Sequence, residues 1–545
     1  MNDRSRRLAS MLATATLSAG AMSAGSPAEA SPTARAAGAL SAPADEGGAG
    51  HLHVALDTWH DSLSTFDLNG DGDTYAFGQV GALRLRLGGD VELGKGLTFH
   101  GELDAYAGRT YGDPTELGTD RVEAPFRDAV RFQRLPILPR RFSLSWASPV
   151  GVVELGHTTS HWGLGLLANS GQRDGRLFAD PQRGNLVERL SFATAPLIGL
   201  SDDPNSYAQR LTMAVAGDLV FADAQAELLD EDLNHKDTAW QGIFALFLRP
   251  PSEQGERPRH ALSGGGYVVY RDQEYADGDT LQALIFDGHV RYVQRLGASS
   301  QLRYELETAW IQGETNRLVT ELGTEGVDVE SSGTAFELAW SSMVSGLPFE
   351  LVGLAGTASG DGDPDDGVLN RFTFHADYDA GMILFAHVIP ALQRQAVSEV
   401  DDPLRTAEPP EGLESLPGWG GISGASYGGL RLVVGPWRDL ELGLQYIAAT
   451  TTAPLTDPYA SFSAGGSPTN PFGGNGSGSL GQEFNVAARY AFELPVLDGL
   501  AGQFRLTYGA FLPGEVLEGP EGKMGTVHLA QAALSFDCDC VGGDR

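Results

Sequence analysis

The segment around Asp67 has the ligand spacing of the first half of a calcium-binding loop. Asp67, Asn69 and Asp71 supply oxygen atoms at alternate positions, and Gly72 follows where such a loop needs glycine for its sharp turn. The last position of that loop requires a glutamate with two coordinating oxygens, and in this chain it is Gly78. The spacing therefore makes these residues candidates for weak calcium binding only.

A second acidic segment repeats the alternation further along the chain. Asp361, Asp363 and Asp365 alternate, but Gly367 stands one position too late for the same loop. The chain carries 71 acidic and 37 basic residues, which gives a formal net charge of −34. Because acidic loops are common in such a chain, we expect solvated carboxylates here and keep weak calcium binding as the alternative. No resident cofactor is expected.

Other catalytic and metal-binding patterns do not rise above chance. His157 and His161 are four residues apart, a spacing that suits a metal only on a helix, and they flank a predicted strand end and a glycine-rich turn. Cys538 and Cys540 are the only cysteines, and we expect them on an exposed, non-catalytic tail. No nucleophile elbow and no phosphate-binding glycine loop is present. We expect the chain not to be an enzyme.

The composition excludes several classes of protein. The acidic balance argues against a nucleic-acid partner, because few basic residues are available to neutralise phosphates. A hydrophobic content of 42% is too high for general disorder. The longest apolar stretch, residues 381–392, has about twelve residues, whereas a spanning helix needs roughly 20. A helical membrane protein is therefore excluded.

The N-terminal residues have the features of an export signal. Arg4, Arg6 and Arg7 form a basic start, a mildly apolar stretch follows over residues 8–22, and Ala28-Glu29-Ala30 is a small-x-small cleavage pattern. We predict a signal peptide over residues 1–30. Residues 31–50, rich in Ala, Gly, Ser and Pro, are predicted to form a flexible lead-in.

From residue 51 onward the dominant hydrophobic period is two, which predicts β-strands. Leu302, Tyr304 and Leu306 alternate with Arg303 and Glu305, for example. Similar runs recur over residues 83–87, 284–292, 336–340, 440–446, 484–494, 503–510 and 527–536.

Three features favour a membrane barrel over a soluble sandwich. Many strands reach ten residues or so, near the 9–11 needed to cross a bilayer at a tilt. Aromatic residues gather near strand ends, as at a membrane–water interface; these are Trp146, Trp240, Trp310 and Trp340. Connections also alternate in length. The short ones include 148–151, 344–348 and 435–439, and the long ones include 110–126, 157–185, 312–332, 395–423 and 451–479.

We therefore predict an all-β fold, a large transmembrane antiparallel barrel of about 16–18 strands with short periplasmic turns and long extracellular loops. The barrel spans residues 51–536, with strand assignment uncertain at 127–135 and 376–388, and residues 537–545 form a C-terminal tail. The last strand ends on Phe536, which resembles the terminal aromatic signal of outer-membrane barrels. The predicted location is the cell outer membrane.

Two short segments resemble the alginate-export-type family of porin-like barrels. One is the run from Ala358 to Gly367, similar to a Ser-Gly-Asp-x-Asp-Pro-x-Asp stretch at a strand exit. The other is His161-Trp162-Gly163-Leu164-Gly165, similar to a Trp-Gly-x-Gly segment. The resemblance covers about twenty residues and implies a large outer-membrane barrel with a pore, while the anionic polysaccharide of that family does not carry over.

We expect a passive channel or exporter for small solutes or polysaccharide, whose selectivity depends on inward-facing charges. The alternative is a structural or surface-interaction barrel with a filled lumen and acidic external loops. Expected partners are outer-membrane lipid, the barrel-assembly machinery and the solute, with oligomeric state open. The candidate lumen residues are Arg84, Arg86, Glu102, Asp104, Asp287, Arg291, Arg303, Glu305, Glu307, Arg431, Glu441, Arg489, Glu493 and Arg505.

Overall fold

The computed structural model describes most of the chain from residue 51 onward. The described residues are 51–76, 78–112, 116–117, 121–122, 137–171, 177–178, 184–203, 205–223, 238–251, 258–275, 278–319, 325–362, 367–400, 421–457, 461, 467, 469–494 and 500–541. The predicted signal peptide and lead-in, the calcium candidates Asp363 and Asp365, and residues 127–135 all lie outside them.

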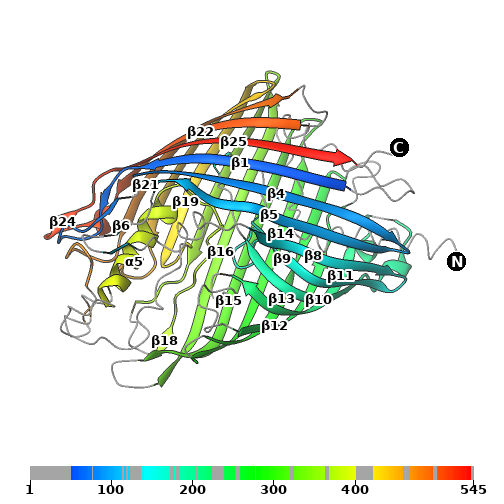
Figure 1. Cartoon of the computed structure of the whole chain (residues 1–545), viewed down its shortest axis with the longest axis horizontal. Helices are drawn as coiled ribbons and strands as arrows, with labels where there is room; N and C mark the ends of the chain where they lie inside the picture. The colour runs from blue at the N-terminus through cyan, green and yellow to red at the C-terminus, as the bar shows by residue number, and fades with distance from the viewer. Residues whose placement is uncertain are drawn as a thin grey trace.

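Eighteen long strands form one closed antiparallel barrel (Figure 1). Neighbours around the ring follow one another along the chain, and β1 closes the ring by pairing with both β4 and β25. The barrel strands are β1 (His51–Leu63), β4 (Gly78–Gly94), β5 (Leu97–Tyr111), β8 (Leu138–Ser148), β9 (Gly151–Ser160), β10 (Asn185–Thr194), β11 (Leu211–Ala222), β12 (Thr238–Leu248), β13 (His260–Glu274), β14 (Thr280–Arg295), β15 (Gln301–Val319), β16 (Glu325–Val344), β17 (Leu347–Ala358), β19 (Ala425–Trp437), β20 (Leu440–Thr451), β21 (Ser479–Glu493), β22 (Leu500–Pro513) and β25 (Val527–Val541). The predicted fold class is confirmed.

The remaining elements are short. The additional strands are β2 (Phe66–Asp67), β3 (Thr74–Ala76), β6 (Glu116–Leu117), β7 (Arg121–Val122), β18 (Val368–Leu369), β23 (Glu518–Gly519) and β24 (Gly522–Lys523). The helical elements are η1 (Ile198–Leu200), α4 (Tyr207–Arg210), the π-helix η2 (Leu384–Val388), α5 (Ile389–Val400) and η4 (Glu515–Leu517). Among the described residues, no helix is both long enough and apolar enough to span a bilayer.

The alternation of side chains along each strand separates an apolar outer face from a polar inner face. On β15, Leu306 is 42% exposed on the outside, whereas Glu305 is 5% exposed on the inside. Outward residues on other strands are likewise large and apolar, which is the inverse of a soluble protein surface. Since a closed barrel pairs every strand edge, its wall can face lipid without unpaired backbone groups. The outer surface is that of an outer-membrane barrel.

On the outer face, Trp146, Trp240 and Trp340 lie near the ends of their strands. The prediction is wrong for Trp310, which lies in the middle of β15 because that strand continues to Val319. Trp146, Trp240, Trp310 and Trp340 are all at least 38% exposed. The Trp340 indole Nε1 donates a hydrogen bond to the Ser300 hydroxyl, 3.0 Å away in the turn before β15. A ring with one apolar side and one polar contact suits a membrane–water interface.

The two ends of the barrel differ as predicted. The turns β8–β9, β16–β17 and β19–β20 are tight hairpins at residues 149–150, 345–346 and 438–439. The start of β1 and the end of β25 share this end, while α5 lies at the opposite end (Figure 1). The prediction of a long loop at 312–332 is wrong. β15 and β16 extend into this range and pair as far as Val319 and Glu325. Residues 376–388 are not a strand.

The last strand also runs beyond its predicted end. β25 continues from Phe536 to Val541, and its final residues pair with the first residues of β1. Cys538 is therefore a buried strand residue opposite Val54, and not part of an exposed tail. The apolar–polar alternation stops at Asp537-Cys538-Asp539, which is why the strand was predicted to end at Phe536. The backbone of these residues is nevertheless paired with β1.

Two connections from the long-loop end fold into the barrel. We call residues 161–171, after β9, the first lumen segment, and residues 371–388, between β17 and β19, the second lumen segment. Their apolar side chains join inward wall residues in the largest buried cluster; members from the segments include Leu164, Leu166, Phe372, Phe374, Tyr378, Ile383, Leu384 and Phe385. The core of this molecule therefore lies inside the lumen.

Candidate channel lumen

Three arginines and three carboxylates form a charged cluster on the inner wall of β1, β4, β5 and β8. Arg84 Nη2 lies 2.8 Å from Asp57 Oδ2. Arg86 donates two bonds to Asp104, of 2.7 and 3.1 Å. Arg140, which is fully buried, lies 2.8 Å from Glu102 and also donates to the Ser170 carbonyl oxygen of the first lumen segment. The four predicted residues Arg84, Arg86, Glu102 and Asp104 are thus brought together.

A second charged cluster lies on β14, β15 and β16. Arg303 contacts Glu305 directly and lies 3.4 Å from Glu337 Oε2. Arg291 Nη1 is 3.7 Å from Glu305 Oε1. Three predicted residues therefore share one site, and their partner Glu337 was not among the predicted lumen residues. Adjacent inward charges of opposite sign stabilise one another across strands.

The other predicted residues are more dispersed. Arg489 pairs with Glu441 across β20 and β21. Arg505 donates to Gln531 Oε1 at 2.7 Å and to the Leu177 carbonyl oxygen at 3.2 Å. Arg431 is buried on β19, and Glu493 is exposed at the end of β21.

Glu307 on β15 binds the backbone of the first lumen segment. Its carboxylate is fully buried and accepts hydrogen bonds from the N–H groups of Leu164, Gly165 and Leu166, the last two at 3.1 and 3.2 Å. The glycines of the Trp-Gly-x-Gly motif make this possible. Gly163 and Gly165 have φ of +55° and +87°, and a Cβ on Gly163 would lie 2.4 Å from the Glu307 carboxylate.

Trp162 fixes the same segment from its other side. Its ring meets Phe247 and Tyr267 edge-on, with centroids 5.6 and 5.0 Å apart. The Tyr267 hydroxyl donates to Asp287 Oδ2 at 3.3 Å. Asp287, one of the predicted lumen residues, therefore belongs to the inner wall beside Glu307. The motif is therefore a backbone site for a carboxylate, with an aromatic anchor.

Glu483 on β21 plays the same part for the second lumen segment. It is 1% exposed and accepts bonds from the N–H groups of Met382, Ile383 and Leu384, of 2.5, 3.1 and 2.9 Å. Leu384 begins η2, which continues directly into α5. The N–H groups at the start of a helix lack partners within it, and a carboxylate there also interacts favourably with the helix dipole. Glu483 was not among the predicted lumen residues.

The two lumen segments also contact each other. His375 donates its backbone N–H to the Leu166 carbonyl oxygen at 2.6 Å, and its Nε2 contacts Asn185 Oδ1. Asn169 Nδ2 donates to the Asp377 carbonyl oxygen at 3.3 Å. These bonds join the segments near the start of β10, so together they narrow the lumen.

Part of the β9–β10 connection reaches the far wall. A Cβ added at Gly443 would lie 2.3 Å from Leu177 Cδ2. Gly443 is on β20, which is nine strands from β10 in either direction around the ring. This contact and the bond from Arg505 to Leu177 show that the β9–β10 connection crosses the whole lumen.

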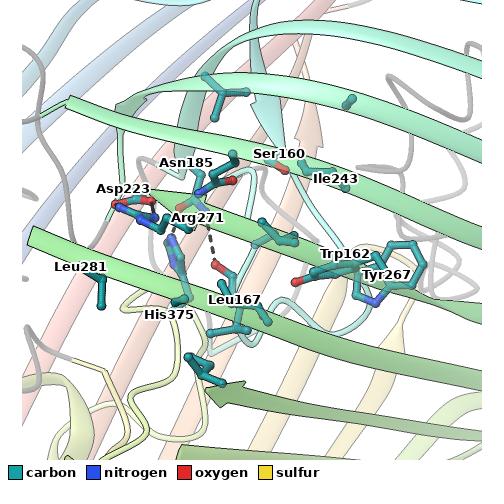
Figure 2. Close-up of a pocket in the computed structure, with 18 of the residues that line it drawn as sticks. Ser160, Trp162, Leu167, Asn185, Asp223, Ile243, Tyr267, Arg271, Leu281 and His375 are labelled. Carbon is teal, nitrogen blue, oxygen red and sulfur yellow. Dashed lines mark hydrogen bonds and ion pairs between the residues drawn. The ribbon is translucent and has the colours of Figure 1, made fainter. Parts of the chain in front are cut away.

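A cavity of about 320 Å³ remains between the lumen segments and the wall of β9–β16 (Figure 2). The wall supplies Arg189, Arg271 and Arg317 together with aliphatic residues, and the segments supply Trp162, Leu167, Arg371 and His375. Figure 2 shows Arg271 and Asp223 near Asn185 and His375, with Trp162 and Tyr267 further along the cavity.

The cavity lining is positively charged. Of its described residues, four are arginines and only Asp223 is acidic. Asp223 lies 2.6 Å from Arg271, while Asp218, outside the lining, lies 2.7 Å from Arg189. Desolvation lowers the pKa of Arg371 to about 10, an effect that the negative charge of Asp361 partly opposes, so this arginine stays charged at neutral pH. None of the four arginines was among the predicted lumen residues.

The calcium candidates do not form a ligand cluster in the described residues. Asn69 Oδ1 accepts backbone N–H bonds from Asp71 and Asp73 at 3.0 and 3.2 Å, and its Nδ2 donates to Asp73 Oδ2. Asp361 Oδ2 accepts from the Asn370 N–H. The described residues hold no group of three or more His, Cys, Asp or Glu side chains that could bind a metal ion.

One hydrogen-bonded chain combines the residue types of a serine hydrolase. His100 Nδ1 lies 2.5 Å from Asp90 Oδ1, and its Nε2 lies 2.8 Å from the Ser145 hydroxyl. All three residues are on neighbouring strands of the inner wall, and Ser145 is paired on both sides, to Thr98 and Glu154. Because the backbone N–H groups around Ser145 serve the sheet, they are not free to stabilise an oxyanion. We therefore interpret the bonds between Asp90, His100 and Ser145 as a structural part of the barrel wall.

Several solved structures are similar to this chain over most of its length. The chain is similar to OccK11 (OpdR) of Pseudomonas aeruginosa at 14% identity and a TM-score of 0.43, over 91% of this chain and 98% of that one. It is similar to a BenF-like porin from Pseudomonas fluorescens Pf-5 at 9% and 0.45, over 91% and 99%. For OccAB4 of Acinetobacter baumannii the values are 12% and 0.44, over 90% and 98%. No family model matches the sequence, and neither does any curated protein.

Proposed function

We propose that this protein is a passive outer-membrane channel for small anionic solutes. The supporting observation is the cavity between the lumen segments and the β9–β16 wall, whose described charged residues are four arginines and one aspartate. A barrel of about 18 strands is wide enough for an aqueous path unless segments fill it. Positive charge in a narrow space with low-dielectric walls raises the local concentration of anions.

The size of this space supports a small solute and not a polymer. The lumen segments bond to each other, and the β9–β10 connection contacts β20 across the lumen. A polysaccharide chain would need a continuous wide path past these contacts. The short resemblance to alginate-export-type barrels is therefore not the basis of the proposal.

The charge preference can be measured in planar lipid bilayers. Under a salt gradient, the reversal potential of the purified protein should indicate a preference for chloride over potassium, and small carboxylates should carry current. Arg271→Gln should reduce that preference because Arg271 borders the cavity, whereas Arg303→Gln, in the second charged cluster, should change it less. Cation preference in the unaltered protein, or equal shifts in the two variants, would contradict the proposal.

A structural barrel with a filled lumen remains the second candidate, and one observation favours it. Both lumen segments pack into a single apolar cluster that reaches several wall strands. On this alternative the purified protein inserts into bilayers but produces no conductance steps. The same recordings therefore separate the two candidates.

A further inference from the structure

We propose that Glu307 and Glu483 are positioning residues that set the aperture of the channel by holding the two lumen segments in place. The inference rests on the channel function proposed above. Each carboxylate projects from the barrel wall, is at most 1% exposed, and accepts the backbone N–H groups of three consecutive residues.

These bonds are made to the backbone, so they fix the path of each segment and not the place of one side chain. Glu307 Oε2 accepts from Leu164 and Gly165, and Oε1 accepts from Leu166. Consecutive N–H groups that converge where glycines adopt positive φ form a concave anion site in the backbone. Here a wall carboxylate occupies that site, which joins the segment to β15.

The second attachment is made to the start of a helix, whereas the first is made to a glycine-rich turn. Glu483 accepts from residues 382–384, at the beginning of the helical run that η2 and α5 form together. Gly381 permits the close approach, because a Cβ there would lie 3.0 Å from both carboxylate oxygens. Asn485 Nδ2 donates to Glu483 Oε1 at 2.7 Å and orients the carboxylate from the same strand.

Both attached segments border the cavity. The first contributes Trp162, Leu167 and Ala168 to its lining, and the second contributes Phe374 and His375. If either attachment is lost, one side of the cavity is free to move while the wall stays intact. The two carboxylates therefore determine the size of the path without touching the solute.

Both carboxyl oxygens are required as acceptors at these positions. In Glu307→Gln, one acceptor oxygen becomes an amide N–H2 group, so at least one backbone N–H of the segment faces another donor. The same holds for Glu483→Gln. A matched control is Glu305→Gln, which makes the same carboxyl-to-amide substitution on the same face of β15 two residues away. Glu305 is held by wall residues, namely Arg303, Arg291 and His289.

Single-channel conductance in planar bilayers tests the proposal. Glu307→Gln and Glu483→Gln should raise the conductance about two-fold or more and add fluctuation between levels, as expected when a segment that narrows a wide barrel is released. Glu305→Gln should leave the conductance near that of the unaltered protein. Equal conductance in all four proteins, or an equal rise in all three variants, would overturn the proposal.

Labelling of a buried cysteine provides a readout that does not need a conducting channel. Ile383→Cys is introduced in a background with Cys538→Ser and Cys540→Ser. Ile383 is fully buried beside Glu483, so a maleimide reagent should react slowly. Adding Glu483→Gln should speed labelling about ten-fold or more by releasing the segment, and unchanged labelling would refute the positioning role. If the unaltered protein carries no current, the channel function fails, while this readout still decides the attachment.

Folding of each variant is checked by the heat-dependent shift in gel mobility that closed barrels show. If a glutamate variant does not fold, Gly165→Ala tests the first attachment from the side of the segment and leaves the wall unchanged. Gly165 has φ of +87°, and a Cβ there would lie 2.7 Å from Asn169 Nδ2. We expect the same rise in conductance, and an unchanged conductance would contradict the role of Glu307.

Discussion

Introducing a charge on the outer face of β15 tests whether that face of the barrel wall contacts lipid. Leu306 is five residues from Gln301, where the strand begins, and Trp340 lies opposite Leu302 near the membrane interface. Five residues correspond to roughly 17 Å along the strand and about 13 Å along the axis of a tilted barrel. The apolar band is about 25 Å tall, so Leu306 lies near its middle.

At that depth, Leu306→Arg should cost about 2–4 kcal/mol of folding free energy. The proper control is Gln241→Arg, because Gln241 faces the cavity, where a long polar side chain has room. Glu305→Arg would be a poor control: it would place a third positive charge beside Arg303 and Arg291. Folding free energies come from urea titrations of the protein refolded into lipid vesicles. If Gln241→Arg cost as much as Leu306→Arg, the assignment of inner and outer faces would be wrong.

Three further outcomes are expected. Asp104→Asn should destabilise the barrel by about 3 kcal/mol in the same urea titrations, because it leaves Arg86 buried without its bidentate partner; a change near zero would refute a structural role for this pair. Raising the pH through about 10 should weaken the anion preference as Arg371 loses its proton, and reversal potentials of Arg371→Gln should lack this step. Calcium should bind the Asp67 loop weakly in calorimetric titrations, because Asn69 Oδ1 already accepts two backbone bonds; micromolar binding that Asp67→Asn abolishes would contradict this.

The sequence was sufficient for the barrel because the hydrophobic period is local. Each strand carries its own alternation, so the inward direction of Arg303 and Glu305 follows from their immediate neighbours. The same rule, applied to β10 and β13, would have found Arg189 and Arg271, which line the cavity. The inward direction of both arginines was therefore predictable from the alternation along their own strands.

The attachments inside the lumen could not be predicted in this way. Glu307 bonds to residues 141–143 positions away, and Glu483 to residues 99–101 positions away. Nothing in the alternation around Glu483 distinguishes it from any other inward polar residue. The Trp-Gly-x-Gly motif was visible as a motif, but its partner on β15 is defined only once the chain is folded.

The pairing of β1 with β25 has a consequence for how the molecule is assembled. His51 is in register with Val541, so the ring closes through contacts between residues almost the whole described chain apart. Pairing at such sequence separation is slow, because the intervening chain must be ordered first. Until then β1 presents an unpaired edge to any other strand, including that of a second copy. Domain-swapped or aggregated assembly intermediates should therefore involve these two strands before any others.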